Sequence, residues 1–168
     1  MNEKIEEVFI SYGLGNYDEN KFNPIENIKS FNIKPKGGLW CSPVNSSYGW
    51  RDWCEAEEFV KGQGFSNYFK FNLKDMNRVY KINSFFDLLL FPYKIKTPGQ
   101  NYIDYEEAAK HYDAIWLTEE GQRETRLPEL NGLYDIDGSN INLYGWDCES
   151  LLILNKEAII NVQYFTEP

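Results

Sequence analysis

The C-terminal residues 142–165 constrain the fold of this chain more than any other stretch of its sequence. One acid, Glu149, is followed by an apolar run at 151–154, and a short turn at 155–157 leads to a second strand-like run at 159–165. An apolar run of this length between polar turns is typical of a buried strand. A charge at the start of such a strand must stay near water or find a partner. The stretch therefore predicts a terminal hairpin with Glu149 at its edge.

Strand and helix patterns alternate irregularly along the rest of the chain. The pattern predicts strands at 8–12, 39–42, 65–73, 78–82 and 112–117, and helices at 49–60, 85–90 and 105–111. It also predicts one helical turn or a loose amphipathic segment at 24–31, and loops at 93–102 and 119–133. Ser84 and Asp104 are expected to cap the helices that follow them. The order lacks regular βαβ alternation, and no Gly-x-Gly-x-x-Gly follows a strand. We therefore expect an α+β fold with a mainly antiparallel, split sheet and short flanking helices.

Length and composition predict one folded domain over residues 1–168. The chain has 42% apolar and 17% aromatic residues, which is ample for a core. It has no apolar run of about 18 residues, and its acidic N-terminus lacks an apolar signal-peptide region. We therefore expect no membrane association. Cys41, Cys54 and Cys148 are odd in number and widely spaced, which favours neither a disulfide framework nor a zinc site and fits a reduced cytoplasm.

The net charge of −9 argues against general nucleic-acid binding, because such proteins need a basic face to displace counterions. Residues 135–142 faintly resemble a calcium-binding loop. However, their glycine falls at the fourth position instead of the sixth, and a hairpin turn at Asp137 and Gly138 is the simpler interpretation. No metal site is expected.

Three segments carry a family resemblance. They are Val8-Phe-Ile-Ser-Tyr-Gly13, Gly38-Leu-Trp-Cys-Ser42 and the stretch from Glu149 through the apolar run. In this order they resemble the first strand, the aromatic strand and the glutamate strand of the ADP-ribosyltransferase superfamily, in its poly-ADP-ribose polymerase and diphtheria-toxin branch. Tyr12 stands where that branch has His, and Trp40 stands where it has Tyr. The middle of the chain, about 65–133, matches no motif.

The resemblance implies an enzyme that uses NAD as substrate, breaks its nicotinamide bond and passes ADP-ribose to a macromolecular acceptor, possibly a protein. The size of the chain resembles that of bacterial or phage effectors. Glu149 would be the catalytic carboxylate and Trp40 the plate that stacks on nicotinamide. Ser11 or Tyr12 would bind ribose hydroxyls, and the backbone of Gly13 would receive the amide.

Two further residues complete the expected NAD site. Ser42 lies on the aromatic strand, although it is also the natural start of the turn at Pro43. Arg51 is the candidate cation for the pyrophosphate. Lys34 and Lys36 also lie near the aromatic strand in sequence and are interpreted as surface charges.

Each of these residues also has a purely structural interpretation. Glu149 could be an ordinary strand-edge acid, solvated or paired with Lys156 or Arg51, and Trp40 could be a core residue. The only histidine, His111, ends a helix and has no catalytic pattern around it, so we interpret it as structural. The alternative function is a non-enzymatic inhibitor or immunity-type protein with a degenerate pocket.

Overall fold

The computed structural model describes residues 7–12, 17–28, 34–59, 63–97, 100–133 and 141–167. The strands are β1 (Phe9–Tyr12), β2 (Leu39–Pro43), β3 (Asn67–Leu73), β4 (Val79–Ile82), β5 (Lys94–Thr97), β6 (Gln100–Ile103), β7 (Ala114–Leu117), β8 (Ser150–Ile153) and β9 (Ile159–Thr166). The α-helices are α1 (Trp50–Ala56), α2 (Phe85–Leu90), α3 (Tyr105–Ala108) and α4 (Glu119–Thr125). Short 3-10 turns are η1 (Glu19–Lys21), η2 (Gln63–Phe65), η3 (Met76–Arg78), η4 (Pro128–Asn131) and η5 (Lys156–Ala158).

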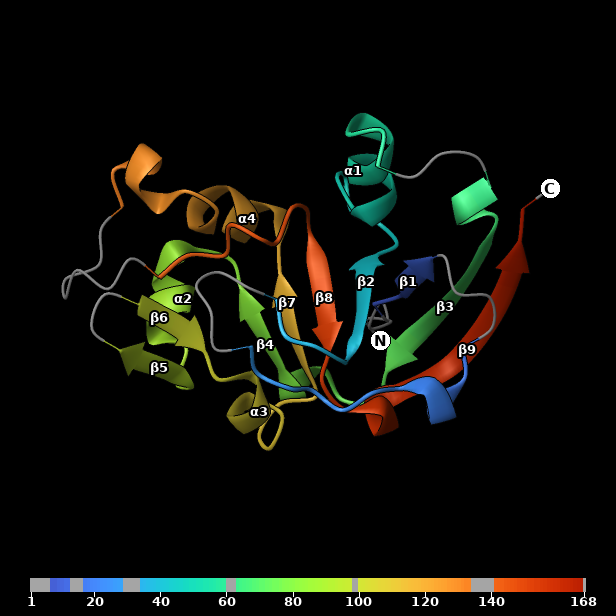
Figure 1. Cartoon of the computed structure of the whole chain (residues 1–168). Helices are drawn as coiled ribbons and strands as arrows, with labels where there is room; N and C mark the ends of the chain where they lie inside the picture. Colours follow the sequence, from blue (N-terminus) through green and yellow to red (C-terminus); the bar gives the residue numbers. More distant parts are fainter. Residues whose placement is uncertain are drawn as a thin grey trace, which may run out of the picture.

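A seven-stranded sheet in the order β4-β7-β8-β2-β1-β3-β9 organises the fold (Figure 1). Its strand pairs are antiparallel except for β4 and β7, which run parallel. This confirms the expected α+β class with a mainly antiparallel sheet and short helices. None of the helices within the described ranges is long and apolar enough to cross a bilayer.

The sheet opens between β1 and β2. These two strands pair at only two positions, Phe9 with Pro43 and Ile10 with Ser42, whereas β1 stays paired with β3 along its full length. Beyond the last shared pair, the hydroxyl of Ser11 donates to the carbonyl of Trp40 at 3.1 Å. We call this place, where the ladder gives way to a side-chain bridge, the fork.

Paired residues define two faces of the sheet. Face A carries the row Trp40, Leu152 and Ile115, and face B carries the row Cys41, Leu151 and Trp116. Face A packs against α2 and α3, while face B packs against aromatic residues of β1 and β3. Because β8 is central and covered on both faces, all four of its residues are buried, which explains its unbroken apolar sequence.

Two glycines allow the chain to enter β2. Gly37 and Gly38 have φ angles of 74° and 68°, a region that side chains other than glycine rarely adopt. A β-carbon on Gly38 would also lie 2.7 Å from the carbonyl oxygen of Ile153, so β2 can approach β8 this closely only with glycine there. The two glycines therefore provide a tight entry into β2.

The expected terminal hairpin is wrong. After β8 the chain passes through η5 and crosses to the far edge of the sheet, where β9 pairs with β3 (Figure 1). Strand β8 instead pairs with β7 and β2. A short turn therefore joins two strands that are not neighbours, which hydrophobic pattern alone does not distinguish from a hairpin.

Both expected loops contain regular structure. Residues 93–102 include most of the hairpin of β5 and β6, and residues 119–133 include α4 and η4. Helix α4 begins where the Thr118 hydroxyl accepts from the backbone N–H of Gly121. A β-carbon on Gly121 would lie 2.1 Å from the carbonyl oxygen of Ile82, so this glycine lets α4 pack directly on β4.

Several local predictions hold. Ser84 accepts from the N–H of Asp87, and Asp104 accepts from the N–H of Glu107, as expected of N-caps. Residues 24–28 form no helix and instead include a bridge between Glu26 and Lys36. Residues 29–31 of that segment, and the expected turn at 137–138, lie outside the described residues.

Candidate functional site

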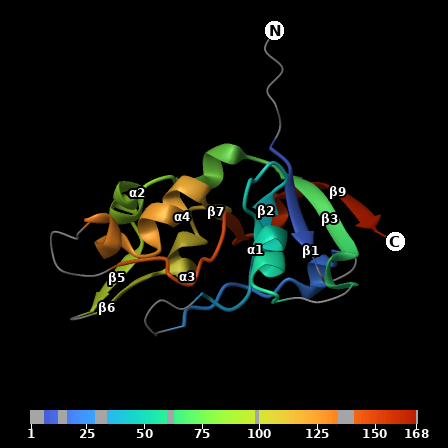
Figure 2. The same ribbon diagram turned by 90° about the horizontal axis from the view of Figure 1, so that it is seen from above.

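A cleft of about 320 Å³ opens on face A at the fork. Its lining comes from β1, β2, α1, the first residue of β8, and the segments just before β2 and β8. These residues are Ile10, Ser11, Tyr12, Lys34, Gly38, Leu39, Trp40, Cys41, Trp50, Asp147, Cys148 and Ser150. Helix α1 stands beside β1 and β2, apart from the group formed by α2, α3 and α4 (Figure 2). The volume lies in the range of small-molecule sites.

The walls of this cleft are aromatic and carry one charge of each sign. The ring of Trp40 is held by an edge-to-face contact with Trp146, with centroids 4.7 Å apart. The Lys34 ammonium lies 4.9 Å from the centre of the Trp40 ring and 5.9 Å from that of Trp50. It is also 3.6 Å from a carboxylate oxygen of Asp147. The cleft thus already holds a cation over an aromatic plate, beside an acid.

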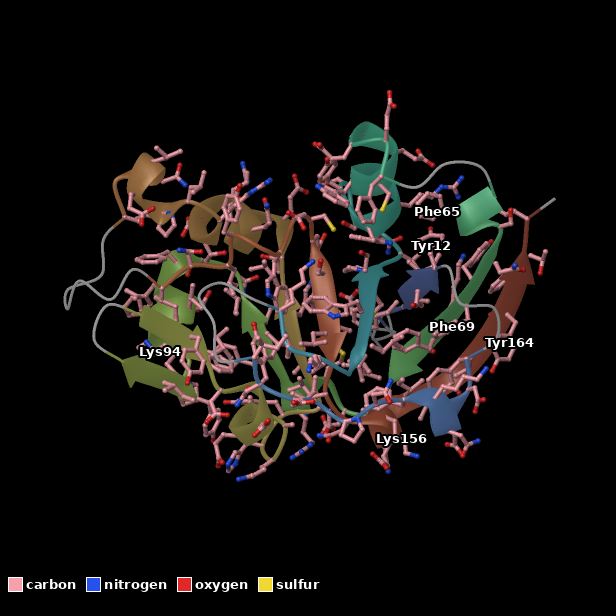
Figure 3. The ribbon with its side chains drawn as sticks, viewed as in Figure 1. Tyr12, Phe65, Phe69, Lys94, Lys156 and Tyr164 are labelled. Carbon is pink, nitrogen blue, oxygen red and sulfur yellow. The ribbon has the colours of Figure 1, made fainter. Side chains whose placement is uncertain are left out.

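Tyr12 closes the β1 side of the cleft. Its ring meets Phe65 edge-to-face at 5.4 Å, at the end of β1 below α1 (Figure 3). Burial raises the pKa of Tyr12, and a hydrogen bond with the Arg51 side chain acts in the opposite direction. Arg51 also pairs with Glu55 at 2.9 Å and with Glu167 at 3.3 Å. The expected pyrophosphate cation is therefore tied to two carboxylates.

The hydroxyls of Ser11 and Ser42 hold the scaffold of the cleft. Ser11 is bonded to Trp40 across the fork, as described above. Ser42 donates to the carbonyl of Glu149 at 3.0 Å and accepts from the N–H of Trp50 at 3.0 Å. It therefore ties β2 to both the start of β8 and the start of α1, and its side chain does not line this cleft. Gly13 lies outside the described residues.

Glu149 is placed on the other face of the sheet. It precedes Leu151 by two residues and so shares face B with it. Its carboxylate is buried and accepts from the indole N–H of Trp116 at 3.0 Å. The Trp116 ring in turn lies 4.0 Å from the ammonium of Lys81. The structure thus brings Trp40 and Tyr12 to one cleft, and it does not bring the carboxylate of Glu149 there.

The structural pairings considered for Glu149 are not the ones observed. Lys156 lies in η5, at the opposite end of β8 (Figures 1 and 3). Arg51 is engaged by Glu55 and Glu167. The observed partner is the indole N–H of Trp116, which is a neutral donor and not a cation.

Sequence analysis missed three polar groups of the cleft, Asp147, Cys148 and Ser150. Asp147 is also 3.9 Å from Arg126, and its side chain is 23% exposed. Burial raises the pKa of the Cys148 thiol, which makes it a weak nucleophile at neutral pH. The alternation of side chains along a strand could have indicated Ser150, because it lies two residues before Leu152 and therefore on the same face of the sheet. The register that places Trp40 opposite Leu152 was not readable from the sequence.

A second, more polar cleft of about 200 Å³ adjoins the first. The two share Ile10, Tyr12 and Trp50, and the second is also lined by Arg51, Lys70 and Glu167. Among the described residues, no three His, Cys, Asp or Glu side chains gather as a metal site would need.

His111 stacks on Tyr93 with ring centroids 4.7 Å apart and lies 3.3 Å from Glu107, consistent with a structural role.

Comparisons with protein-family models, with curated proteins and with solved structures find no match to this chain.

Proposed function

We propose that this chain is an NAD-dependent ADP-ribosyltransferase with an ADP-ribosyltransferase-like fold, and that it binds the nicotinamide end of NAD in the cleft at the fork. The observation that carries the proposal is the Lys34 ammonium, held over Trp40 and beside Asp147. A pyridinium ring is a flat cation. It would gain the same cation–π attraction from Trp40 and would add stacking.

The chemistry needs a carboxylate close to the ribose. When the bond between C1′ of the ribose and the pyridinium nitrogen breaks, both electrons go to the nitrogen and nicotinamide leaves as a neutral molecule. Positive charge develops on the ribose ring, and a nearby carboxylate stabilises it more than it stabilises the ground state. A nucleophile of the macromolecular acceptor then attacks C1′ and loses its proton.

The geometry favours Asp147 over Glu149 for this role. Asp147 lines the cleft, and its distance of 3.6 Å from Lys34 exceeds a hydrogen bond, so a ligand can displace the lysine. Glu149 is engaged with Trp116 on face B. We therefore assign Asp147 as the catalytic carboxylate and Glu149 as a positioning residue that fixes the start of β8.

The test is nicotinamide release from NAD by purified wild type, Asp147→Asn and Glu149→Gln. Asn and Gln keep the shape of each side chain and remove its charge. Loss of release with Asp147→Asn, together with retention in Glu149→Gln, supports this assignment. Loss with Glu149→Gln alone would return catalysis to Glu149.

The alternative function is a non-enzymatic protein that binds and inhibits a partner. The observation that favours it is that the carboxylate of Glu149 faces away from the Trp40 cleft. Titration calorimetry with NAD separates the two functions. No heat of binding, together with no nicotinamide release, would leave the inhibitor or immunity-type protein as the better account.

A further inference from the structure

Helix α1 and the residues after it present an aromatic ledge, which we define as Trp50, Trp53 and Phe59. The rings of Trp50 and Trp53 stack with centroids 5.2 Å apart and an interplanar angle of 20°. Phe59 packs 5.2 Å from Trp53 and is 64% exposed. An exposed ring fixed against two other rings offers apolar area at little cost in side-chain entropy.

The segment that carries the ledge is acidic. Residues 50–59 include Asp52, Glu55, Glu57 and Glu58 against the single cation Arg51. That cation is already paired with Glu55 and Glu167. Glu57 is exposed, one turn after Trp53. The local charge is therefore acidic, as is that of the whole chain, and it favours a basic partner.

The chain already places its own cations on neighbouring rings. Lys34 lies over Trp40 and Trp50, and the guanidinium of Arg51 lies 5.8 Å from the ring centre of Phe65. Over Trp53 and Phe59 no cation lies within the part of the chain that the structure describes. An aromatic face with carboxylates around it suits an arginine or lysine supplied from outside.

We propose that the aromatic ledge binds an arginine- or lysine-rich segment of a partner protein, and that this protein is the ADP-ribose acceptor. The second half rests on the proposed function, whereas the binding itself does not. Trp50 connects the two sites, because it belongs to the ledge and also lines the cleft at the fork. A segment held on α1 would therefore lie beside the place where the ribose carbon becomes electrophilic.

The test is fluorescence anisotropy with a labelled peptide of alternating arginine and glycine, added to the full chain without NAD. We expect Phe59→Ala and Glu57→Gln each to weaken binding by at least about fivefold, through loss of ring area or of an attractive charge. The matched controls are Phe86→Ala on α2, where the ring is equally exposed at 64%, and Glu129→Gln in η4. Neither control should change the affinity.

An equal loss in ledge and control variants would overturn the proposal, because binding would then not depend on the ledge. Sedimentation of wild type and Phe59→Ala tests a second occupant. If wild type is a dimer and Phe59→Ala is a monomer, the ledge binds a second copy of the chain, and the proposal is overturned. Nicotinamide release by the wild type is measured separately, without peptide. If the wild type releases nicotinamide but does not bind the peptide, the proposed partner site on the ledge is refuted and the proposed function stands. If the wild type binds the peptide but releases no nicotinamide, the proposed function is refuted and the partner site stands.

Discussion

Removing the indole N–H of Trp116 should reveal what Glu149 does. The residue Glu149 is only 9% exposed, and the Trp116 indole N–H donates to its carboxylate at 3.0 Å. A hydrogen bond to a charged group contributes about 1.5–3 kcal/mol, and a buried acceptor left without its donor carries the full desolvation cost. Trp116→Phe keeps most of the ring and loses the donor. We therefore expect it to lower the free energy of unfolding by about 3 kcal/mol, part of which is lost packing.

A double-mutant cycle separates the bond from the packing. Glu149→Met keeps the length of the side chain and removes the acceptor, so the pair Trp116→Phe and Glu149→Met isolates the interaction. Urea unfolding of the four proteins should give a coupling free energy of about 1.5–3 kcal/mol. A coupling below about 0.5 kcal/mol, within the error of additive sites, would refute the view that Glu149 is fixed by Trp116.

Two further predictions concern the scaffold. Gly121→Ala should lower the free energy of unfolding by about 2 kcal/mol or more, because its β-carbon would lie 2.1 Å from the Ile82 carbonyl oxygen. The β-carbon of Gly132→Ala would meet nothing within 4 Å, so this variant should lose only about 1 kcal/mol, through its positive φ. Thermal unfolding compares the two variants, and equal losses would contradict the packing argument. Burial raises the pKa of Tyr80 to about 12, so the unfolded chain loses this proton first, and the stability that Tyr80 contributes should be present below about pH 10 and disappear as the pH rises towards 12. Tyr80→Phe should flatten this part of a plot of unfolding free energy against pH, and an unchanged slope would contradict it.

Much of the secondary structure could be predicted because short stretches of sequence indicate which strands are buried and where helices begin. The run at 151–154 predicted a buried strand, and Ser84 and Asp104 predicted helix starts. These features depend on residues close together in the chain. Helix α4 escaped prediction because its buried side is made by Gly121 and Thr125, small residues that give no apolar stripe.

The strands that pair with β8 could not be predicted from the sequence. The face of the sheet that carries each candidate site residue could therefore not be predicted either. Strand pairing is decided by contacts between distant segments, and a shift of one residue moves a side chain to the opposite face. The resemblance predicted one site for Trp40 and Tyr12, and the register brings both to the cleft at the fork. For Glu149 the same register points to face B, which the resemblance alone did not reveal.

The most direct test of the account is the rate of nicotinamide release from NAD by Asp147→Asn, measured beside wild type and Glu149→Gln at equal folded concentration. The account predicts release by wild type, a loss of about 100-fold or more with Asp147→Asn, and little change with Glu149→Gln, whose amide still accepts from Trp116. Undiminished release by Asp147→Asn would contradict the assignment of the cleft carboxylate. Absence of both release and NAD binding in wild type would contradict the proposed function itself.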